Sequence, residues 1–182
     1  MIGVVGGGQL ARMLVQAAAQ REVSIAVQTS NPADPAAGLA SRLVAADPTD
    51  VAGTRELVVG CDGITFENEW VNIDALLPLE QQGVRFRPSL AALSPLVDKL
   101  SQRQLLDDLA IPSPPWSPLS LISPAQPALP QGWTFPVMAK ACRGGYDGKG
   151  TLVLRDIDAL AQLLRAVPAE DWLLESWVDY EL

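Results

Sequence analysis

The 182-residue sequence contains no histidine, and this absence removes several classes of chemistry. Without an imidazole, the chain cannot use a histidine base, a serine–histidine or cysteine–histidine pair, or a histidine-ligated metal. Only two cysteines occur, Cys61 and Cys142, and they are too far apart in sequence to form a CxxC motif. This sparse use of cysteine predicts a reduced, cytoplasmic protein rather than a disulfide-stabilised one.

Basic residues are also scarce, because 13 lysines and arginines stand against 21 acidic residues, for a net charge of −8. A chain of this charge is a poor candidate for nucleic-acid binding, so we expect no nucleic-acid partner. The balance of 48% apolar and 19% charged residues is that of an ordinary globular protein. It excludes a disordered tail and a fibre.

We also expect no membrane-spanning or targeting segment. The one long uncharged stretch, residues 110–139, contains eight prolines, which a spanning helix cannot tolerate. We interpret it as a stiff surface linker followed by a new strand. The sequence starts on an apolar, strand-like segment at residues 2–5, and no basic leader precedes it.

Short apolar segments alternate with helical patterns in the first half of the chain. Strands are predicted at 2–5, 23–27, 43–45, 63–66 and 84–86, and helices at 9–20, 49–60 and 72–82. Thr49 or Asp50 is the expected cap of the second helix, and Asn72 is that of the third. Alternation with short connections predicts an α/β fold with a Rossmann-like parallel sheet. We assign this domain to residues 1–90.

The rest of the chain predicts a second and smaller unit. Residues 91–134 combine a helical segment, interrupted at Pro95, with the proline-rich linker. Strands follow at 135–140, 151–154 and 172–178, and Asp156 is expected to cap a helix that runs to about Val167. Three strands and one helix have little core of their own, so we expect residues 135–182 to be the beginning of a domain.

The first glycine-rich turn is GGGQLA at residues 6–11, which follows a strand and opens a helix. This GxGxxA pattern lets the backbone approach a phosphate at the helix N-terminus. The next strand ends at Gln28, however, where a dinucleotide site needs an acid for the ribose. We therefore favour a phosphate-bearing small ligand. A nicotinamide or flavin dinucleotide and a ligand-free tight turn are the alternatives.

The second glycine-rich segment is RGGYDGKG at residues 143–150, between two strands, so it is not a Walker P-loop. Arg143 and Lys149 supply cations for phosphate oxygens, and Lys140 ends the preceding strand as a third. A plain hairpin turn is the alternative. Four glycines flanked by two cations favour the phosphate contact.

A pair of acids, Glu67 and Glu69, follows the strand predicted at 63–66. Doubly wound folds bind ligands at the carboxyl ends of their strands. The alternate spacing of the two acids allows both to face one side. A solvated loop explains them equally well on this pattern alone.

Four segments occur in the order of one family: GGGQLAR at 6–12, DGITFENE at 62–69, DKLSQRQLLDDLAIPSPPW at 98–116 and GGYDGKGT at 144–151. Over the whole chain they resemble N5-carboxyaminoimidazole ribonucleotide synthetase, a member of the ATP-grasp superfamily, in its N-terminal part only. The resemblance implies a Rossmann-like pre-ATP-grasp domain followed by the first, incomplete part of an ATP-grasp domain.

The resemblance implies a ligase of de novo purine biosynthesis that uses ATP to carboxylate 5-aminoimidazole ribonucleotide with bicarbonate. Its products are N5-carboxyaminoimidazole ribonucleotide, ADP and phosphate. ATP and Mg²⁺ are the implied cofactors, with the Mg²⁺ ligands beyond Leu182. The family commonly forms homodimers. Because the later part of the family's ATP-grasp domain is absent, we expect no turnover from residues 1–182 alone, and we name no certain catalytic residue.

The family's binding residues carry over by position. ATP-binding positions are Lys99, Lys140, Gly145, Tyr146, Asp147, Gly148, Lys149, Gly150, Thr151, Glu175, Ser176, Trp177 and Val178. Substrate-binding positions are Gly8, Gln9, Leu10, Glu67 and Glu69. Tyr146 and Asp147 are also expected to touch the ribonucleotide. Two positions depart from the family, since Lys99 stands where arginine is usual and Thr151 where glutamine is common.

Several other functions compete with this interpretation. A related ATP-grasp carboxylase or formate-using ligase would share the same phosphate-binding segments. A non-catalytic nucleotide-binding module, or one half of a split ATP-grasp ligase, would explain a chain of this length. A nicotinamide oxidoreductase would explain the first glycine turn, but Gln28 argues against it.

Overall fold

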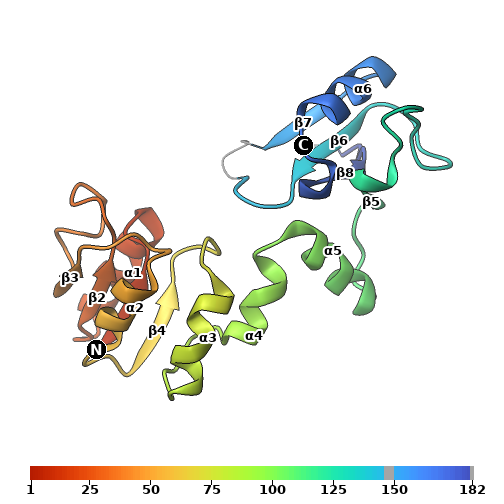
Figure 1. Ribbon diagram of the computed structural model, residues 1–182. Helices are drawn as coiled ribbons and strands as arrows, with labels where there is room; N and C mark the ends of the chain where they lie inside the picture. The colour runs from red at the N-terminus through yellow and green to blue at the C-terminus, as the bar shows by residue number, and fades with distance from the viewer. Residues whose placement is uncertain (146–149, 181–182) are drawn as a thin grey trace. The chain divides into compact units, whose positions relative to one another are not determined.

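The computed structural model describes residues 1–145 and 150–180. The chain forms two compact units, Met1–Ser94 and Pro95–Leu182 (Figure 1). None of the described helices has both the length and the apolar composition needed to cross a bilayer.

The first unit is a doubly wound α/β domain. Its elements are β1 (Ile2–Val5), α1 (Gln9–Ala19), β2 (Ile25–Gln28), β3 (Arg42–Val44), α2 (Val51–Val58), β4 (Gly63–Phe66), α3 (Ile73–Gln81) and α4 (Leu90–Leu93). The four strands pair in the order β3-β2-β1-β4, and every pair is parallel. This order is one half of the Rossmann topology, which confirms the predicted fold class.

Alternate side chains of the central strands enter two separate cores. Val4 and Val27 pack with Ala11 and Val15 of α1. On the other face, Val5, Ala26 and Ile64 pack with residues of α2 and α3. Successive residues of a strand point to opposite faces, so α1 covers one face of the sheet and α2 and α3 cover the other.

Helix starts follow the predicted capping residues. Asp50 accepts a hydrogen bond from the Ala52 N–H, and Asn72 accepts one from the Ala75 N–H. The strand expected at 84–86 is not formed, because Phe86 makes only a single parallel bridge to Ile64. This bridge consists of two 2.8 Å bonds, from the Ile64 N–H to the Arg85 carbonyl and from the Arg87 N–H to the Ile64 carbonyl.

The second unit is built on an antiparallel sheet. Its elements are η1 (Ser94–Leu96), α5 (Lys99–Asp108), β5 (Trp116–Pro118), η2 (Leu119–Leu121), β6 (Val137–Ala141), β7 (Thr151–Leu154), α6 (Ile157–Ala166), η3 (Ala169–Asp171) and β8 (Trp172–Ser176). The strands pair in the order β5-β8-β6-β7. Asp156 caps α6 through a 2.8 Å bond from the Ala159 N–H, as predicted.

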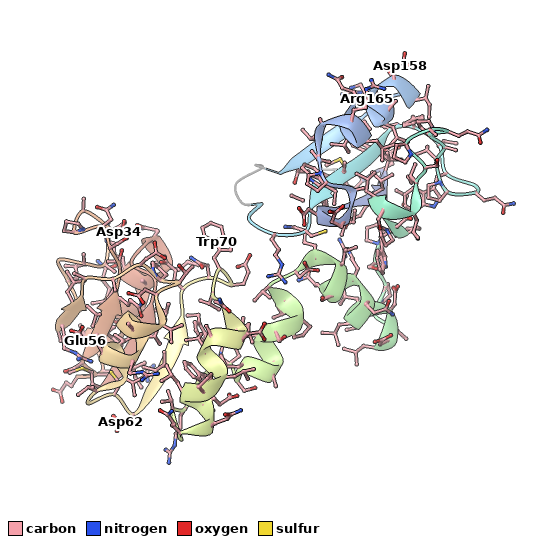
Figure 2. The ribbon with its side chains drawn as sticks, in the orientation of Figure 1. Asp34, Glu56, Asp62, Trp70, Asp158 and Arg165 are labelled. Atoms are coloured by element: carbon pink, nitrogen blue, oxygen red, sulfur yellow. The ribbon has the colours of Figure 1, made fainter. Side chains whose placement is uncertain are left out.

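Helix α6 covers one face of this sheet with Leu160, Leu163 and Leu164, which join a core containing Val137 and Leu174. Its polar side chains Asp158 and Arg165 point away from the sheet (Figure 2). The opposite face carries Met138, Lys140 and Glu175, because Met138 pairs directly with Glu175 and Lys140 lies two residues further along β6.

The proline-rich stretch is not the plain surface linker that we expected. Residues Trp116–Pro118 form β5, which pairs with β8 at the edge of the sheet. Leu119 and Ile122 are 0% and 6% exposed and belong to the core under α6. An edge strand tolerates proline because only one of its sides must supply hydrogen bonds, so this segment folds with the unit.

Candidate functional site

The glycine turn before α1 is closed by Glu67. The Glu67 carboxylate accepts hydrogen bonds from the backbone N–H groups of Gly8 (2.6 Å), Leu10 (3.2 Å) and Ala11 (3.4 Å). Gly6 has a φ of +105°, which favours glycine at the turn. A Cβ on Gly8 would lie 2.5 Å from Glu67 Oε1. The glycines therefore allow a carboxylate to reach the helix N-terminus.

This arrangement differs from the free phosphate site that the GxGxxA pattern suggested. The N-terminal amides of α1 already have a negatively charged acceptor, which is favourable at this end of a helix. A phosphate at these amides would have to displace Glu67 against its charge. The structure thus brings Gly8, Leu10 and Glu67 together, whereas Gln9 and Glu69 are exposed beside them. Glu67 and Glu69 lie beyond β4, which ends at Phe66. The alternation of side chains along a strand therefore does not place the two acids on one side.

A second group of side chains closes the other side of the turn. Thr29 follows β2 and donates its hydroxyl to Asp34, and Asn31 Nδ2 donates to the same carboxylate at 2.9 Å. A Cβ on Gly7 would meet Thr29 at 2.7 Å. Figure 2 shows Asp34 and Trp70 at one edge of the sheet and Asp62 at the opposite edge. The glycine turn therefore lies at the carboxyl edge, where this fold binds ligands.

Gln28 stands where a dinucleotide site has an acid, and it is fully buried, with both ends of its amide hydrogen-bonded. Its Nε2 donates to the carbonyl oxygens of Asp47 (2.7 Å) and Asp50 (3.0 Å). Its Oε1 accepts the Thr54 hydroxyl at 2.9 Å. These bonds tie β2 to the start of α2, and because the Gln28 side chain is fully buried it cannot bond a ribose at the surface. The geometry agrees with the sequence argument against a nicotinamide or flavin cofactor.

A pocket of about 270 Å³ lies against β8 in the second unit. It is lined by Arg103, Pro114, Met138, Lys140, Glu175, Ser176, Trp177, Val178 and Tyr180. Five of the predicted ATP-binding residues thus share one cavity. The paired part of β8 ends at Ser176, so Trp177 and Val178 lie beyond the ladder. Backbone groups beyond a strand end are free to bond a planar ligand edge.

Glu175 is the charged centre of this pocket. Its side chain is 4% exposed, and Lys140 Nζ donates to Oε2 at 2.5 Å. Arg103 of α5 donates to Oε1 through Nε at 2.7 Å and also through one terminal nitrogen. Two cations against one carboxylate leave the cluster with a net charge of +1, which suits a polyphosphate ligand. Sequence reasoning missed Arg103, since only its pairing with a residue 72 positions away gives it a role.

The glycine-rich segment between β6 and β7 is described only at its two ends. Gly145 and Gly150 lie side by side, since a Cβ on Gly150 would be 3.2 Å from the Gly145 Cα. The Gly150 carbonyl accepts a 2.7 Å bond from the Ala141 N–H, and Thr151 pairs with Lys140 across the ladder. Four predicted residues lie outside the described part of the chain: Tyr146, Asp147, Gly148 and Lys149.

The start of α5 is fastened to the segment that follows β6. The Lys99 N–H donates to the Cys142 carbonyl at 2.9 Å, and Arg143 Nε donates to Asp98 at 3.2 Å. Lys99 is therefore beside the root of the glycine-rich segment, but it does not line the pocket against β8. Burial, followed by the nearby carboxylates of Asp98 and Asp171, raises the pKa of the Cys142 thiol to about 11. This thiol is inert at neutral pH.

A larger hollow of about 400 Å³ lies at the other end of β4, between Val58, Asp62 and Arg85. Asp62 there pairs with the Met1 ammonium at 2.7 Å, and this hydrogen bond lowers the pKa of the exposed carboxyl. None of the predicted site residues lines this hollow. We therefore place the candidate site at the pocket against β8 and the glycine turn, each within its own unit.

A metal site is not visible in the described ranges, 1–145 and 150–180. No three acidic or thiol side chains gather there in a way that could hold a cation. The described residues thus do not fit a Mg²⁺ site.

Two family models match the chain. The model described as the ribonucleotide synthetase preATP-grasp domain matches residues 1–95, and the ATP-grasp domain matches residues 104–182. Among curated proteins, N5-carboxyaminoimidazole ribonucleotide synthases from Synechococcus elongatus and Synechocystis sp. are 47% and 46% identical. The alignments cover 99% of this chain and 45% of each relative.

Solved structures of related enzymes have the same fold. The Aspergillus clavatus carboxyaminoimidazole ribonucleotide synthase in complex with ATP superposes with a TM-score of 0.85 at 27% identity, covering 97% of this chain and 47% of that one. The Aspergillus clavatus enzyme with ADP and 5-aminoimidazole ribonucleotide gives a TM-score of 0.82 at 26% identity, covering 97% and 46%. The chain thus spans about half the length of the relatives that it matches.

These matches confirm the resemblance drawn from the sequence motifs. The first unit and the matched pre-ATP-grasp segment have nearly the same bounds, Met1–Ser94 and 1–95. The chain belongs to the ribonucleotide synthetase family in which a pre-ATP-grasp domain precedes an ATP-grasp domain, and it corresponds to the N-terminal part of N5-carboxyaminoimidazole ribonucleotide synthetases.

Proposed function

We propose that this chain contributes the substrate domain and the first part of the ATP-grasp domain to a carbon–nitrogen ligase. The ligase joins bicarbonate to the exocyclic amine of 5-aminoimidazole ribonucleotide, with ATP converted to ADP and phosphate. One observation carries the proposal: the pocket against β8 gathers Lys140, Glu175 and residues 176–178 within the segment that matches the ATP-grasp domain. Related structures have been solved with ATP, and with ADP and 5-aminoimidazole ribonucleotide.

The adenine ring is assigned to the pocket against β8. Its edge would bond the backbone beyond Ser176, and the pocket walls supply Met138 and Trp177 as apolar contacts. The cation of Lys140 would face the phosphates, since it lies on the same face of the sheet as Glu175. Gly145 to Thr151 would lie over the phosphates, and Lys99 would approach them from the start of α5.

The ribonucleotide is assigned to the first unit. Glu67 stands at the carboxyl edge of the sheet with its carboxylate fixed by three backbone N–H groups. A carboxylate in this position accepts hydrogen bonds from hydroxyl or amine groups but repels a phosphate. We therefore assign Gly8, Gln9, Leu10, Glu67 and Glu69 to the sugar or the amine of the substrate rather than to its phosphate.

The reaction consists of two group transfers. Bicarbonate oxygen attacks the γ-phosphorus of ATP, the bond to the β–γ bridging oxygen breaks, and carboxyphosphate and ADP form. The amine of the ribonucleotide then attacks the carboxyl carbon, inorganic phosphate leaves, and the amine proton passes to solvent. Phosphoryl transfer depends mainly on positioning and on cations that offset charge, which suits a chain without histidine.

Three further properties belong to this proposal. Mg²⁺ is the expected counter-ion of ATP, with ligands outside the residues described. A homodimer is the expected assembly, and the cytoplasm is the expected location. Each follows from the family rather than from a contact in this chain.

A phosphate-release assay on the protein encoded by the intact gene tests the proposal. Purified protein is incubated with Mg²⁺ and ATP, and phosphate release is measured with bicarbonate, with 5-aminoimidazole ribonucleotide, and with both. The proposal predicts release that needs both substrates, and transfer of labelled carbon from bicarbonate to the ribonucleotide. Nucleotide binding without any release would favour a non-catalytic module or one half of a split ligase. Release with formate in place of bicarbonate would favour a different ATP-grasp ligase.

A further inference from the structure

We infer that Arg103 is a positioning residue for nucleotide binding. It offsets the charge of Glu175, so that the cluster of Arg103, Glu175 and Lys140 keeps a net positive charge for the phosphates. The inference rests on the proposed nucleotide site. Arg103 lies on α5, in the middle of a helix with no fully buried residue, and it lines the pocket against β8.

The geometry divides the Glu175 carboxylate between two cations. Arg103 holds Oε1 through two of its nitrogens, and Lys140 holds Oε2 through its ammonium. The three side chains are 16%, 4% and 24% exposed for Arg103, Glu175 and Lys140, so solvent screens them only partly. Both oxygens of the carboxylate are therefore engaged before a ligand arrives.

A count of charges shows what Arg103 adds. Arg103, Glu175 and Lys140 together carry +1. Without Arg103, the charges of Glu175 and Lys140 cancel, and the Lys140 ammonium remains paired with the Glu175 carboxylate. Without both Arg103 and Glu175, Lys140 alone restores +1. The inference thus predicts that phosphate affinity follows the net charge of this cluster rather than the presence of any one bond.

A structural role for Arg103 is the alternative to the electrostatic role. Helix α5 also contacts the sheet through Asp107, which accepts a 2.9 Å bond from Trp116 Nε1. Arg103 and Asp107 could therefore both serve to fasten α5 to the sheet. Loss of that fastening would weaken the binding of any adenine ligand, charged or neutral. An electrostatic role affects only ligands with phosphates, and its effect depends on ionic strength.

The test uses the protein encoded by the intact gene and measures the affinities of adenosine, ADP and ATP by calorimetric titration at low and high salt. The variants are Arg103→Gln, Glu175→Gln and the double variant Arg103→Gln/Glu175→Gln. Arg165→Gln is the matched control, because Arg165 carries the same charge on α6 and points away from the sheet (Figure 2). Circular dichroism confirms that each variant is folded.

The expected result is an order of ATP affinities. Arg103→Gln binds ATP about tenfold more weakly than wild type, with a smaller loss for ADP and none for adenosine. The double variant returns to within about threefold of wild type, and Glu175→Gln, with a cluster charge of +2, binds ATP more tightly than the double variant. The differences shrink at high salt, and Arg165→Gln leaves all three affinities unchanged.

Removing one member of a buried ion pair can unfold a protein, so Arg103→Gln is not the only informative variant. If it fails to fold, Glu175→Gln and the double variant still carry the comparison, since they differ by one charge. Equal ATP affinities for these two variants would overturn the inference, as would equal losses of adenosine and ATP in Arg103→Gln. Wild-type protein that binds no ATP would instead contradict the proposed nucleotide site, and the inference would fall with it.

Discussion

The Glu67 carboxylate accepts a 2.6 Å hydrogen bond from the Gly8 N–H, and so joins the end of β4 to the start of α1. The same carboxylate reaches two further amides of the helix, on Leu10 and Ala11. A negative charge at a helix N-terminus is stabilising. The glycine turn thus holds the Glu67 carboxylate at the start of α1.

Replacing Glu67 with alanine should destabilise the first unit by about 1–2 kcal/mol, the usual cost of losing an N-terminal cap with charge. The loss arises because three backbone N–H groups lose their acceptor. Urea unfolding measures the change. Glu69→Ala is the control, since Glu69 is exposed, and it should leave the free energy of unfolding unchanged. Equal effects of the two substitutions would contradict the role given to Glu67.

A methyl group on Gly8 should be costly for a different reason. The added Cβ would lie 2.5 Å from Glu67 Oε1, so the carboxylate must leave its position. We expect Gly8→Ala to lower the free energy of unfolding by about 1–3 kcal/mol. Gly38→Ala is the matched control, because a Cβ on Gly38 meets nothing within 4 Å. If both variants unfold at the same urea concentration as wild type, the close contact between Gly8 and Glu67 is absent in solution.

The proline-rich segment can be tested through two leucines of the same 3-10 turn. Leu119 is 0% exposed and Leu121 is 76% exposed. Because Leu119 fills the core under α6, Leu119→Ala should destabilise the second unit by about 2–5 kcal/mol. Leu121→Ala should change the stability by less than about 0.5 kcal/mol. Thermal unfolding followed by circular dichroism distinguishes the two variants. An unchanged stability in Leu119→Ala would contradict the packing of this segment in the core and would favour a surface linker.

The thiol of Cys142 predicts a pH dependence in the alkaline range. Burial, with help from Asp98 and Asp171, raises its pKa from 9.0 to about 11 in the folded protein. Between these values the unfolded chain loses the proton first, so folding is disfavoured as the pH rises. The free energy of unfolding should fall above pH 9, by at most about 1.4 kcal/mol per pH unit for this one group, and be unaffected below it.

Cys142→Ala removes the titrating group and so isolates its contribution. Wild type and variant are compared by urea unfolding at pH 8, 9, 10 and 10.5, and the difference between them is the informative quantity. The difference in the free energy of unfolding should be constant up to pH 9. Above pH 9 the variant should gain stability relative to wild type. A difference that does not change with pH would mean that the thiol ionises equally in both states.

Local signals made much of the first unit predictable. The bounds of β4, Gly63–Phe66, were predicted because a short apolar run is bounded by glycine and acidic residues. Asn72 was predicted as a cap and Asp50 as one of two candidates, since each lies just before a helical pattern, where a side-chain acceptor satisfies a free N–H. The cap Asp156 of the second unit was predicted in the same way. Strands of a parallel sheet then follow from the alternation of such elements.

The features that were missed depend on contacts between distant residues. Strand β5 pairs with β8 across more than fifty residues, and its proline-rich sequence gives no strand pattern. Arg103 looks like any exposed helical arginine until Glu175 is placed opposite it. The Glu67 contact with Gly8 spans 59 residues, so the sequence indicated an acid near the ligand edge but not the amides that it occupies.

The location of a bound adenine nucleotide tests the account most directly. A crystal structure of the protein encoded by the intact gene, grown with ADP, should show the adenine against β8, bonded to the backbone beyond Ser176, with Lys140 directed at the phosphates. The glycine turn should still hold the Glu67 carboxylate. Nucleotide phosphates bound at the amides of Gly8 and Leu10, with Glu67 displaced, would contradict both site assignments.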